Sequence, residues 1–595
     1  MHIIFNRLEI QLKRASFWLG ITPRQVLFLV LSLPVSIVVP FAAGVGLQMD
    51  HPVAAIFAWL LSIALVLIGG LSRPNIPIRP AQSTLLWIEI LLITTFVIRI
   101  LSTDRLPIVL TGDEASAGID AMKFVTGELN NIFIVGYFSF PTLFHFIQSL
   151  STRIFGQTTV ALRIPSALIG AITVVTVYLA GKKMFNPRAG LLAALSLAAL
   201  HLHMHFSRLG INNIWDAFWY VLVIGALWIG WNHEDRRAYM VAGAALGLSQ
   251  YFYPTSRALF FLLLASLVLA FRFYKEKLHR ALPHLLIMGL IALVTFLPLA
   301  VYYIKYPHEY LAPLRRVSLF GENLNNQIQE TGFSAWKILT TQINTALKAY
   351  TGTPIQSYYN PGIPILQPLA AFFFYIGILM LIHRYRDGRL VLFALWLTIV
   401  GLTGGLSDSP PAAQRYVAAT PACALLIGIG LDGSAKILST RNPKAIKFIN
   451  VLVFIVIISI MVNDFHFYFV KYKELSTIEE THSNGMIAQR LADELKDKPR
   501  GTQVYFLGTP DLGYYYIPSI CYLAPQVIGI DINEPWNSLS EKPDIISDPA
   551  IFVFLQERES EIQAVQNDHP GGMLTAARAW NNDPLFWLYE VHVIQ

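Results

Sequence analysis

The feature that most constrains this chain is a series of apolar runs, each about 20 residues long. A run of that length crosses the hydrocarbon core of a bilayer as an α-helix, which satisfies its own backbone hydrogen bonds. The runs are continuously apolar and do not alternate, so they do not fit a transmembrane barrel. Hydrophobic residues make up 54% of the 595 residues and charged residues only 14%, whereas soluble proteins carry about 25% charged residues. We therefore predict an all-α polytopic membrane protein and exclude a disordered chain, a coiled coil and a nucleic-acid-binding domain.

Thirteen of these runs are predicted to be transmembrane helices. They lie at about residues 26–47, 53–71, 83–103, 162–181, 188–206, 216–232, 238–253, 257–272, 283–304, 363–383, 389–404, 415–432 and 447–464. Because Arg7, Lys13 and Arg14 precede the first run, the N-terminus is predicted to be cytoplasmic.

Residues 134–155 decide the topology, because they are apolar enough to be taken for a further span but contain Pro141 and Arg153. If this segment lies on the membrane surface, the later inner loops hold 16 Lys and Arg residues and the later outer loops hold eight. The positive-inside rule favours that arrangement, so we predict an interfacial helix. The first outer loop then covers about 104–161, the long outer loop covers about 305–362, and the C-terminal domain is extracytoplasmic.

The C-terminal part differs in composition from the rest. From residue 471 onward the chain holds 18 acidic and 9 basic residues, a net charge of −9, whereas the whole chain carries +7, so the preceding part carries +16. A polar helical stretch at 478–497 precedes four short β-like runs, namely TQVYFLG, QVIGIDI, AIFVFLQ and WLYEVHVI. This pattern predicts a small extramembrane α/β domain. Cys423 lies in an apolar run and Cys521 in this domain, so no disulfide is predicted.

Several ionisable residues lie at the predicted outer ends of the spans, where such residues are functional candidates. Asp113 and Glu114 follow the third span in TGDEASAGIDAM, and Asp216 opens the sixth span. Four arginines also lie at outer ends: Arg163, Arg208, Arg257 and Arg415. A carboxylate can take a proton from a hydroxyl group, and guanidinium groups can hold a phosphate as it gains charge. This combination suits the transfer of a group from a phosphate.

Structural explanations exist for each of these residues. An Asp at a helix start is often an N-cap, with Thr111 or Asp113 as the cap of the first of these helices. An Arg at the end of a span can extend to the lipid headgroups. The sequence HLHMH could mark a metal site, but on a helix only His201 and His205 share a face, which favours interfacial histidines.

These motifs, in this order, resemble the GT-C glycosyltransferases, in particular glycosyltransferase family 39. That family has an acidic pair in the first outer loop, which TGDEASAGIDAM matches, and a span that opens with Arg-x-Pro-Ser, which ALRIPSALIGAITVVTVYLAGKKMF matches. Its second outer acid is matched by SRLGINNIWDAFWYVL, and its later Arg-Tyr span by QRYVAATPACALLIGIG. The segment YFYPTSRALFFL is also similar.

The resemblance covers about residues 83–435. We divide the chain into 1–82 with two additional transmembrane helices, 83–464 as the GT-C-like transmembrane domain, and 465–595 as the C-terminal α/β domain. The segment FSFPTLFHF departs from the His-Pro-Pro or Lys-Pro motif of relatives, which leaves open the role of His145.

The resemblance implies a membrane enzyme that moves a sugar from a polyprenyl-phosphate carrier to an acceptor hydroxyl on the outer membrane face, by a single inverting displacement. The acceptor would be a lipid, a glycan or a protein. The implied roles are the general base for Asp113, orientation of the base or acceptor for Glu114, a second acid for Asp216, and contact with the donor phosphate for Arg415, Arg257, Arg208, Arg163 and Tyr416. No compact ligand spacing is present, so we expect no metal cofactor.

We also expect a prokaryotic plasma membrane as the location. Two other classes stay open from the sequence. One is a transporter or flippase for lipid-linked sugars, which broken or repeated helices would favour. The other is an inactive membrane scaffold that binds a partner through the C-terminal domain.

Overall fold

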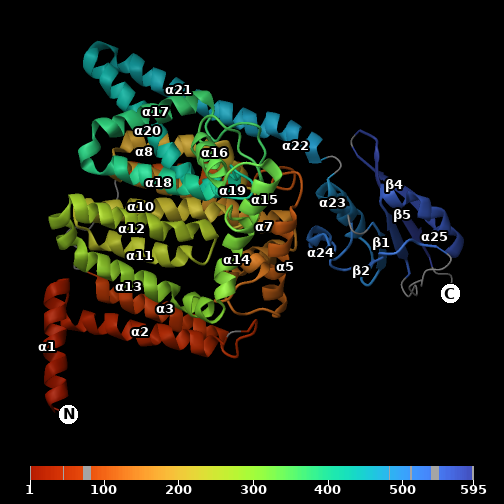
Figure 1. Ribbon diagram of the computed structural model, residues 1–595, viewed down its shortest axis with the longest axis horizontal. Helices are drawn as coiled ribbons and strands as arrows, with labels where there is room; N and C mark the ends of the chain where they lie inside the picture. Colours follow the sequence, from red (N-terminus) through yellow and green to blue (C-terminus); the bar gives the residue numbers. More distant parts are fainter. Residues whose placement is uncertain are drawn as a thin grey trace.

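The computed structural model describes residues 2–44, 46–71, 82–480, 483–508, 512–537, 548–579 and 581–592. The protein is a bundle of long helices with a small mixed domain at one end (Figure 1). Each of the 13 predicted spans contains a helix. These helices are α2 (Pro23–Ala43), α3 (Pro52–Gly70), α4 (Gln82–Ile100), α7 (Thr159–Met184), α8 (Pro187–Ala199), α10 (Ile214–His233), α11 (Arg236–Ser249), α12 (Ala258–Phe273), α13 (Lys275–Lys305), α17 (Pro368–His383), α18 (Arg389–Gly405), α20 (Thr420–Arg441) and α21 (Ile446–His466).

Among the described residues, eight helices are long and apolar enough to cross a membrane on their own. A ninth is added if α1 (His2–Leu19) and α2, which are bent by 100° between Glu9–Leu19 and Pro23–Val39, form one span. Helices α8, α17 and α18 are apolar but shorter. Large apolar side chains such as Phe261, Phe372 and Phe454 are exposed on the outside of the bundle, where a lipid environment would cover them. The prediction of a polytopic helical membrane protein is confirmed.

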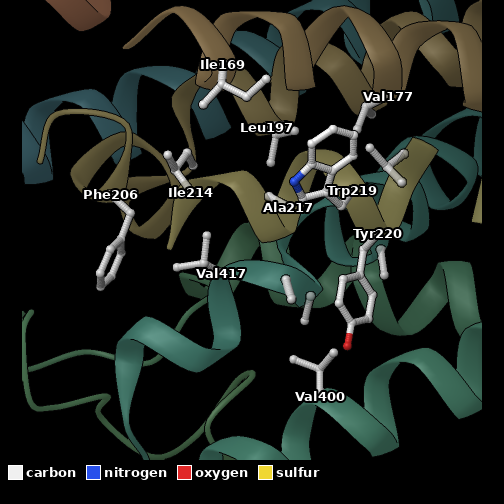
Figure 2. Packing of buried hydrophobic residues seen from close by; sticks show 14 of the residues in the cluster. Ile169, Val177, Leu197, Phe206, Ile214, Ala217, Trp219, Tyr220, Val400 and Val417 are labelled. Atoms are coloured by element: carbon white, nitrogen blue, oxygen red, sulfur yellow. The ribbon is translucent and has the colours of Figure 1, made fainter. Parts of the chain in front are cut away.

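Small residues let the helices of the bundle approach closely. A Cβ atom on Gly377 of α17 would lie 2.1 Å from the Leu426 carbonyl oxygen of α20. A Cβ atom on Gly430 of α20 would lie 2.1 Å from the Phe373 carbonyl oxygen of α17. The two glycines therefore permit the contact in both directions. The neighbouring core is filled by larger side chains, and Figure 2 shows Val177, Leu197, Trp219, Tyr220 and Val400 meeting from four helices.

Shorter helices cover the end of the bundle that faces the mixed domain (Figure 1). They are α5 (Gly112–Thr126), α6 (Thr142–Phe155), α9 (His201–Phe206), α14 (Pro307–Val317), α15 (Glu322–Thr331), α16 (Ala335–Lys348) and α19 (Ala413–Tyr416). Helix α6 corresponds to the predicted interfacial helix and is only 14 residues long. It buries its polar side, with His145 and Gln148, and exposes Ile154 and Phe155, as expected for a helix with lipid beside it.

The C-terminal domain is a mixed α/β unit, as predicted. Its five-stranded sheet has the order β2-β1-β3-β5-β4. The strands are β1 (Gln503–Leu507), β2 (Ile528–Asp531), β3 (Ala550–Phe554), β4 (Met573–Arg578) and β5 (Pro584–Val591), and its helices are α23 (Asn484–Leu495), α24 (Pro518–Leu523) and α25 (Ile562–Asp568). Strands β1, β2 and β3 are parallel, and Tyr505 pairs with Ile530 and Phe552, while β5 is antiparallel to β3.

The four predicted strands correspond to β1, β2, β3 and β5, while β4 was not predicted because its side chains are mostly exposed. The predicted helix at 478–497 is divided between α22 (Lys473–Glu480) and α23, and Ser483 caps the second of these. Cys423 and Cys521 are both free, in agreement with the prediction.

The C-terminal domain docks on the first loop of the bundle through α24. The Ser519 hydroxyl donates a hydrogen bond of 2.9 Å to the Leu110 carbonyl, and the Gln157 amide donates one of 2.6 Å to the Tyr522 carbonyl. The Tyr522 ring packs against Gly118, where a Cβ atom would lie 2.6 Å from a ring carbon. The first loop, α14 and the C-terminal domain thus share one end of the bundle, as the predicted topology requires.

Candidate active site

Helix α5 places the acidic pair at this end of the bundle. The Thr111 hydroxyl accepts a hydrogen bond from the Glu114 amide, and the Glu114 carboxylate accepts one from the Thr111 amide at 3.1 Å. This reciprocal capping box fixes the start of the helix. Thr111 is therefore the N-cap, and Asp113 is free of that structural role.

Asp113 lines a cavity of about 80 Å³ between α5, α6, the start of α10 and α19. The Tyr137 hydroxyl donates a hydrogen bond to Asp113 Oδ1. Burial raises the pKa of the Asp113 carboxyl group above its ordinary value, the Tyr137 hydrogen bond opposes this shift, and the neighbouring Glu114 adds to it. A carboxylate with a raised pKa beside a cavity is suited to accept a proton.

Arg415 is the other predicted site residue that lines this cavity. Arg415 is 7% exposed, and its guanidinium lies 3.4 Å from the Thr403 carbonyl and 3.9 Å from Asp408 Oδ1, with the Tyr253 side chain also beside it. The two measured contacts are long, so the guanidinium is only weakly engaged and can donate to a ligand. A guanidinium group beside a cavity can bind a phosphate through two parallel hydrogen bonds, as a bidentate pair.

Glu114 and Arg163 form a buried ion pair away from the cavity. The Arg163 guanidinium donates to Glu114 Oε1 at 2.8 Å and to Oε2 at 2.9 Å, and both side chains are fully buried. Its other N–H groups donate to the carbonyls of Thr103, Pro107 and Val109. With every donor used, Arg163 has none left for a donor phosphate, so the structure supports a structural role where the sequence predicted a binding role.

The carboxylate oxygens of Glu114 are likewise occupied by hydrogen bonds within the protein. Besides Arg163 and the Thr111 amide, it accepts a hydrogen bond of 2.6 Å from the Gly210 amide. It therefore ties the start of α5 to α7 and to the loop before α10. Glu114 is absent from the cavity lining, so the structure does not support the part of the prediction in which it orients the acceptor directly. Orientation of the base stays a prediction.

Arg208 caps the C-terminal end of α4. Its guanidinium is fully buried and donates to the carbonyls of Ile98, Arg99, Leu101 and Ser102, at 2.8 to 3.1 Å, and to that of Leu106. The last carbonyls of a helix lack a partner within it, and Arg208 supplies one for those of Ile98 and Arg99 in α4. Arg208 thus neither snorkels to lipid nor faces the cavity, and the structure does not support its predicted phosphate contact.

Arg257 lies beside α14 and outside the cavity lining. Its guanidinium stacks on the Tyr310 ring at 4.1 Å, lies 5.5 Å from the Tyr303 ring centroid, and donates to the Tyr310 carbonyl. These contacts attach the long loop to the start of α12. Tyr416 is fully buried, and its hydroxyl donates to the Ala346 carbonyl at 3.0 Å, so it too lies away from the cavity.

Asp216 is buried behind the cavity on the first turn of α10. It accepts a hydrogen bond from the Ser256 hydroxyl through Oδ1, and Oδ2 has no partner among the described residues. The N-cap position of α10 is Asn213, so Asp216 is not a helix cap. The residues that reach the cavity from this element are Asn212 and Asn213.

Sequence reasoning missed several lining residues, among them Tyr137, Asn212 and Gln414. Tyr137 immediately precedes FSFPTLFHF, the segment that departs from the family motif, and Gln414 precedes Arg415 in the Arg-Tyr motif. The charge pattern gave no reason to single out neutral residues. His145, which the sequence left without a role, also lines the cavity.

The described residues contain no group of three or more His, Cys, Asp or Glu side chains that could hold a metal ion. The three histidines of HLHMH have separate partners: His201 contacts the Tyr359 hydroxyl, His203 contacts Arg99, and His205 stacks on the Tyr359 ring. The metal interpretation of this motif is therefore not supported.

A helical bundle with an acidic pair, a surface helix and a cavity at one end defines the class of polytopic membrane proteins with the GT-C fold. Comparison with known structures confirms that fold: ArnT from Cupriavidus metallidurans bound to undecaprenyl phosphate aligns with a TM-score of 0.50 and 15% identity, over 86% of this chain and 98% of that chain. Residues 139–302 match the family described as dolichyl-phosphate-mannose-protein mannosyltransferase.

Two curated relatives carry the same functional name, undecaprenyl phosphate-alpha-4-amino-4-deoxy-L-arabinose arabinosyl transferase. The enzyme numbered 1 from Pseudomonas fluorescens is 28% identical over 194 residues, which are 31% of this chain and 34% of the relative. The enzyme from Pseudomonas paraeruginosa is 27% identical over 166 residues, which are 28% of this chain and 30% of the relative. The matched region is thus about a third of the relatives' length. The predicted resemblance to GT-C glycosyltransferases is confirmed.

Proposed function

We propose that this protein is an integral membrane glycosyltransferase that moves a sugar from a polyprenyl-phosphate carrier to an acceptor hydroxyl. The observation that carries the proposal is the cavity that brings Asp113, a carboxyl group with a raised pKa, together with Arg415, an arginine held only by long contacts of 3.4 and 3.9 Å and by the neighbouring Tyr253. Neither residue alone distinguishes an enzyme from a scaffold. Together they provide the base and the phosphate ligand that glycosyl transfer from a phosphate requires.

The proposed reaction is a single inverting displacement. The acceptor hydroxyl oxygen attacks C1 of the sugar as Asp113 takes the hydroxyl proton, and the bond between C1 and the phosphate oxygen breaks. The electron pair of that bond leaves with the polyprenyl phosphate, whose added negative charge Arg415 stabilises. The products are the glycosylated acceptor and polyprenyl phosphate.

The surroundings of Asp113 support its role as the base. The Tyr137 hydroxyl holds one carboxylate oxygen, which leaves the other for the acceptor. Val317, at the end of α14, also lines the cavity, so the long loop 305–362 lies where it could close over a bound donor. A lipid-linked donor would reach this end of the bundle from the bilayer. We place the reaction on the outer face of a prokaryotic plasma membrane, with the N-terminus inside, because the distribution of Lys and Arg favours that orientation.

The test is a transfer assay in purified membranes with a panel of polyprenyl-phosphate sugars and with lipid, glycan and protein acceptors. Asp113→Asn keeps the size of the side chain and removes the base, so we expect a loss of about 10²–10⁴-fold. Asp104→Asn is the matched control, because Asp104 lies in the same loop, is exposed, pairs with the exposed Arg105 at 3.6 Å, and is absent from the cavity lining. We expect that control to transfer at the wild-type rate.

Equal transfer by wild type and Asp113→Asn would remove Asp113 from the mechanism and direct attention to Asp216. Absence of transfer from every donor by the folded wild-type protein would contradict the enzyme assignment. A flipping assay with the same lipids would then test the transporter alternative.

A further inference from the structure

Three neutral side chains that line the cavity carry buried polar atoms that make no hydrogen bond to the described residues. These atoms are both ring nitrogens of His145, Nδ2 of Asn212 and Oε1 of Gln414. The residues are 0%, 2% and 6% exposed, respectively. Buried polar groups are nearly always hydrogen-bonded, because an unpaired one has lost its hydration without gaining a partner. These three side chains come from α6, from the loop before α10 and from α19, and all of them border one cavity. Their arrangement indicates that a polar ligand supplies the missing hydrogen bonds.

The chemistry of these groups identifies the kind of ligand. Asn212 offers a donor, Gln414 offers an acceptor, and a neutral imidazole offers one of each. A hydroxyl group both donates and accepts, so a ring bearing several hydroxyls can pair with all of them. The remaining wall includes the aromatic rings of Phe140 and Phe144, which suit the apolar faces of a sugar ring.

The charges around the cavity favour a neutral ring over a cationic one. Asp113 is the only carboxylate that lines the cavity among the described residues, and Arg415 is its only guanidinium. Asp120 lies 3.9 Å from His145, but its oxygens accept hydrogen bonds from Lys123 Nζ at 2.8 Å and the Tyr137 amide at 2.6 Å. With Asp113 assigned to the acceptor hydroxyl, an ammonium group on the sugar would meet Arg415, and no other carboxylate of the described residues lines the cavity, since Asp216 lies behind the lining.

The imidazole of His145 agrees with a neutral environment. Its ring lies near the Gln148 side chain and the Ala117 main chain, without a hydrogen bond of normal geometry to either. Burial lowers the pKa of His145, and Asp120 only partly opposes this effect. The ring is therefore neutral near pH 7 and can accept as well as donate.

We propose that His145, Asn212 and Gln414 form the sugar subsite of the donor, and that this subsite selects a neutral, hydroxyl-bearing sugar over an amino sugar. The inference rests on the proposed function and deepens it by naming the substrate class. Gln414 is the chain neighbour of Arg415, so a ring held by Gln414 lies next to a phosphate held by Arg415. That adjacency assigns the subsite to the donor sugar, which is bonded to the phosphate, and not to a sugar of the acceptor.

The experiment measures the binding of four lipids to the full-length protein in detergent. They are undecaprenyl phosphate, its L-arabinose conjugate, its 4-amino-4-deoxy-L-arabinose conjugate and its mannose conjugate. The two arabinose lipids are a matched pair, because they differ only by a hydroxyl in place of an ammonium group. We expect the wild type to bind the neutral arabinose lipid at least about tenfold more tightly than the amino lipid, since an unpaired buried charge or donor costs a factor of this order. We expect the mannose lipid, as another neutral donor, to bind more tightly than the amino lipid as well.

Asn212→Asp supplies the carboxylate that the subsite lacks without changing the size of the side chain. We expect it to lower the ratio of neutral to amino-sugar affinity by about tenfold. The matched control is Asn232→Asp, which places the same change at the exposed far end of α10 and should leave the ratio unchanged. The wild-type ratio is measured independently, so a misfolded variant does not remove the test.

A wild-type ratio of one or below would overturn the inference, as would a ratio that Asn212→Asp leaves unchanged. An effect of Asn212→Asp on acceptor KM alone, with donor affinities unaltered, would also overturn it, by assigning the subsite to the acceptor. Failure of the proposed function looks different: the wild type would then bind none of the four lipids, including undecaprenyl phosphate, and would transfer no sugar.

Discussion

Glu114→Gln tests whether the second residue of the acidic pair is part of the scaffold. In the structure, the carboxylate of Glu114 accepts two hydrogen bonds from Arg163, at 2.8 and 2.9 Å, and one from the Gly210 amide at 2.6 Å. An amide in its place has one oxygen, so its NH₂ group must face an N–H donor. The substitution also leaves the fully buried guanidinium without a counter-charge.

The expected cost follows from that geometry. Removing one partner of a buried, hydrogen-bonded ion pair costs about 3–5 kcal/mol, because the remaining charge is desolvated and uncompensated. Asp113→Asn, one residue earlier, should cost less than about 1 kcal/mol, since burial already disfavours the charged form of Asp113. The assay is equilibrium unfolding of the purified protein by SDS in mild detergent micelles, followed by tryptophan fluorescence.

A double-mutant cycle with Arg163→Met separates the ion pair from other effects. We expect the double variant to be less destabilised than the sum of the single variants. It should not return to wild-type stability, because Arg163 also holds the carbonyls of Thr103, Pro107 and Val109. If Glu114→Gln unfolds at the wild-type SDS concentration while transfer falls as in Asp113→Asn, the structural assignment of Glu114 is wrong and its catalytic assignment returns.

Three further predictions concern the cavity and the domain contact. Tyr137→Phe removes a hydrogen bond that lowers the pKa of Asp113, so the pKa of Asp113 should rise. The acidic limb of the pH–rate profile should then move to higher pH, and an unchanged limb would contradict the contact. Arg415→Lys replaces a two-pronged donor by a point charge, so KM for the donor should rise by about tenfold or more with a smaller change in kcat, whereas an unchanged KM would exclude Arg415 as a phosphate ligand. Gly118→Val should displace the C-terminal domain from α5, because the new Cβ atom would lie 2.6 Å from a ring carbon of Tyr522. Limited proteolysis should then release that domain faster than in the control Gly112→Val, since no atom lies within 4 Å of a Cβ atom placed on Gly112.

The bundle could be predicted from the sequence because its cause is local. An apolar run of about 20 residues must form a helix in a bilayer, wherever the other runs lie. The same reasoning distinguished α6 from the predicted spans, because its polar residues and the distribution of Lys and Arg both indicated a helix on the membrane surface. Strand β4 was missed because it is an edge strand with exposed side chains, which leaves no apolar pattern to detect.

The site could be predicted only in part. The acidic pair and the arginines were found because charge at the end of a span is rare and costly, but their separate roles were not. Glu114 and Asp113 are neighbours in sequence, yet one is enclosed by Arg163 and Gly210 and the other faces the cavity. On a helix, adjacent residues point about 100° apart, and only the packing around α5 decides which of them is buried.

What the sequence by itself determined was the membrane architecture, the two-part organisation and the candidate chemistry, because hydropathy and charge act on each segment independently. What only the tertiary structure decided was which polar groups remain available. Arg163 and Arg208 donate short hydrogen bonds to carbonyls 54 to 110 residues away, whereas the contacts of Arg415 to Thr403 and Asp408 are long, at 3.4 and 3.9 Å. The neutral residues of the cavity become candidates for ligand binding only because the tertiary structure brings α6, the start of α10 and α19 together. The physical reason is that hydrogen-bond satisfaction depends on contacts between distant segments, which no local pattern records.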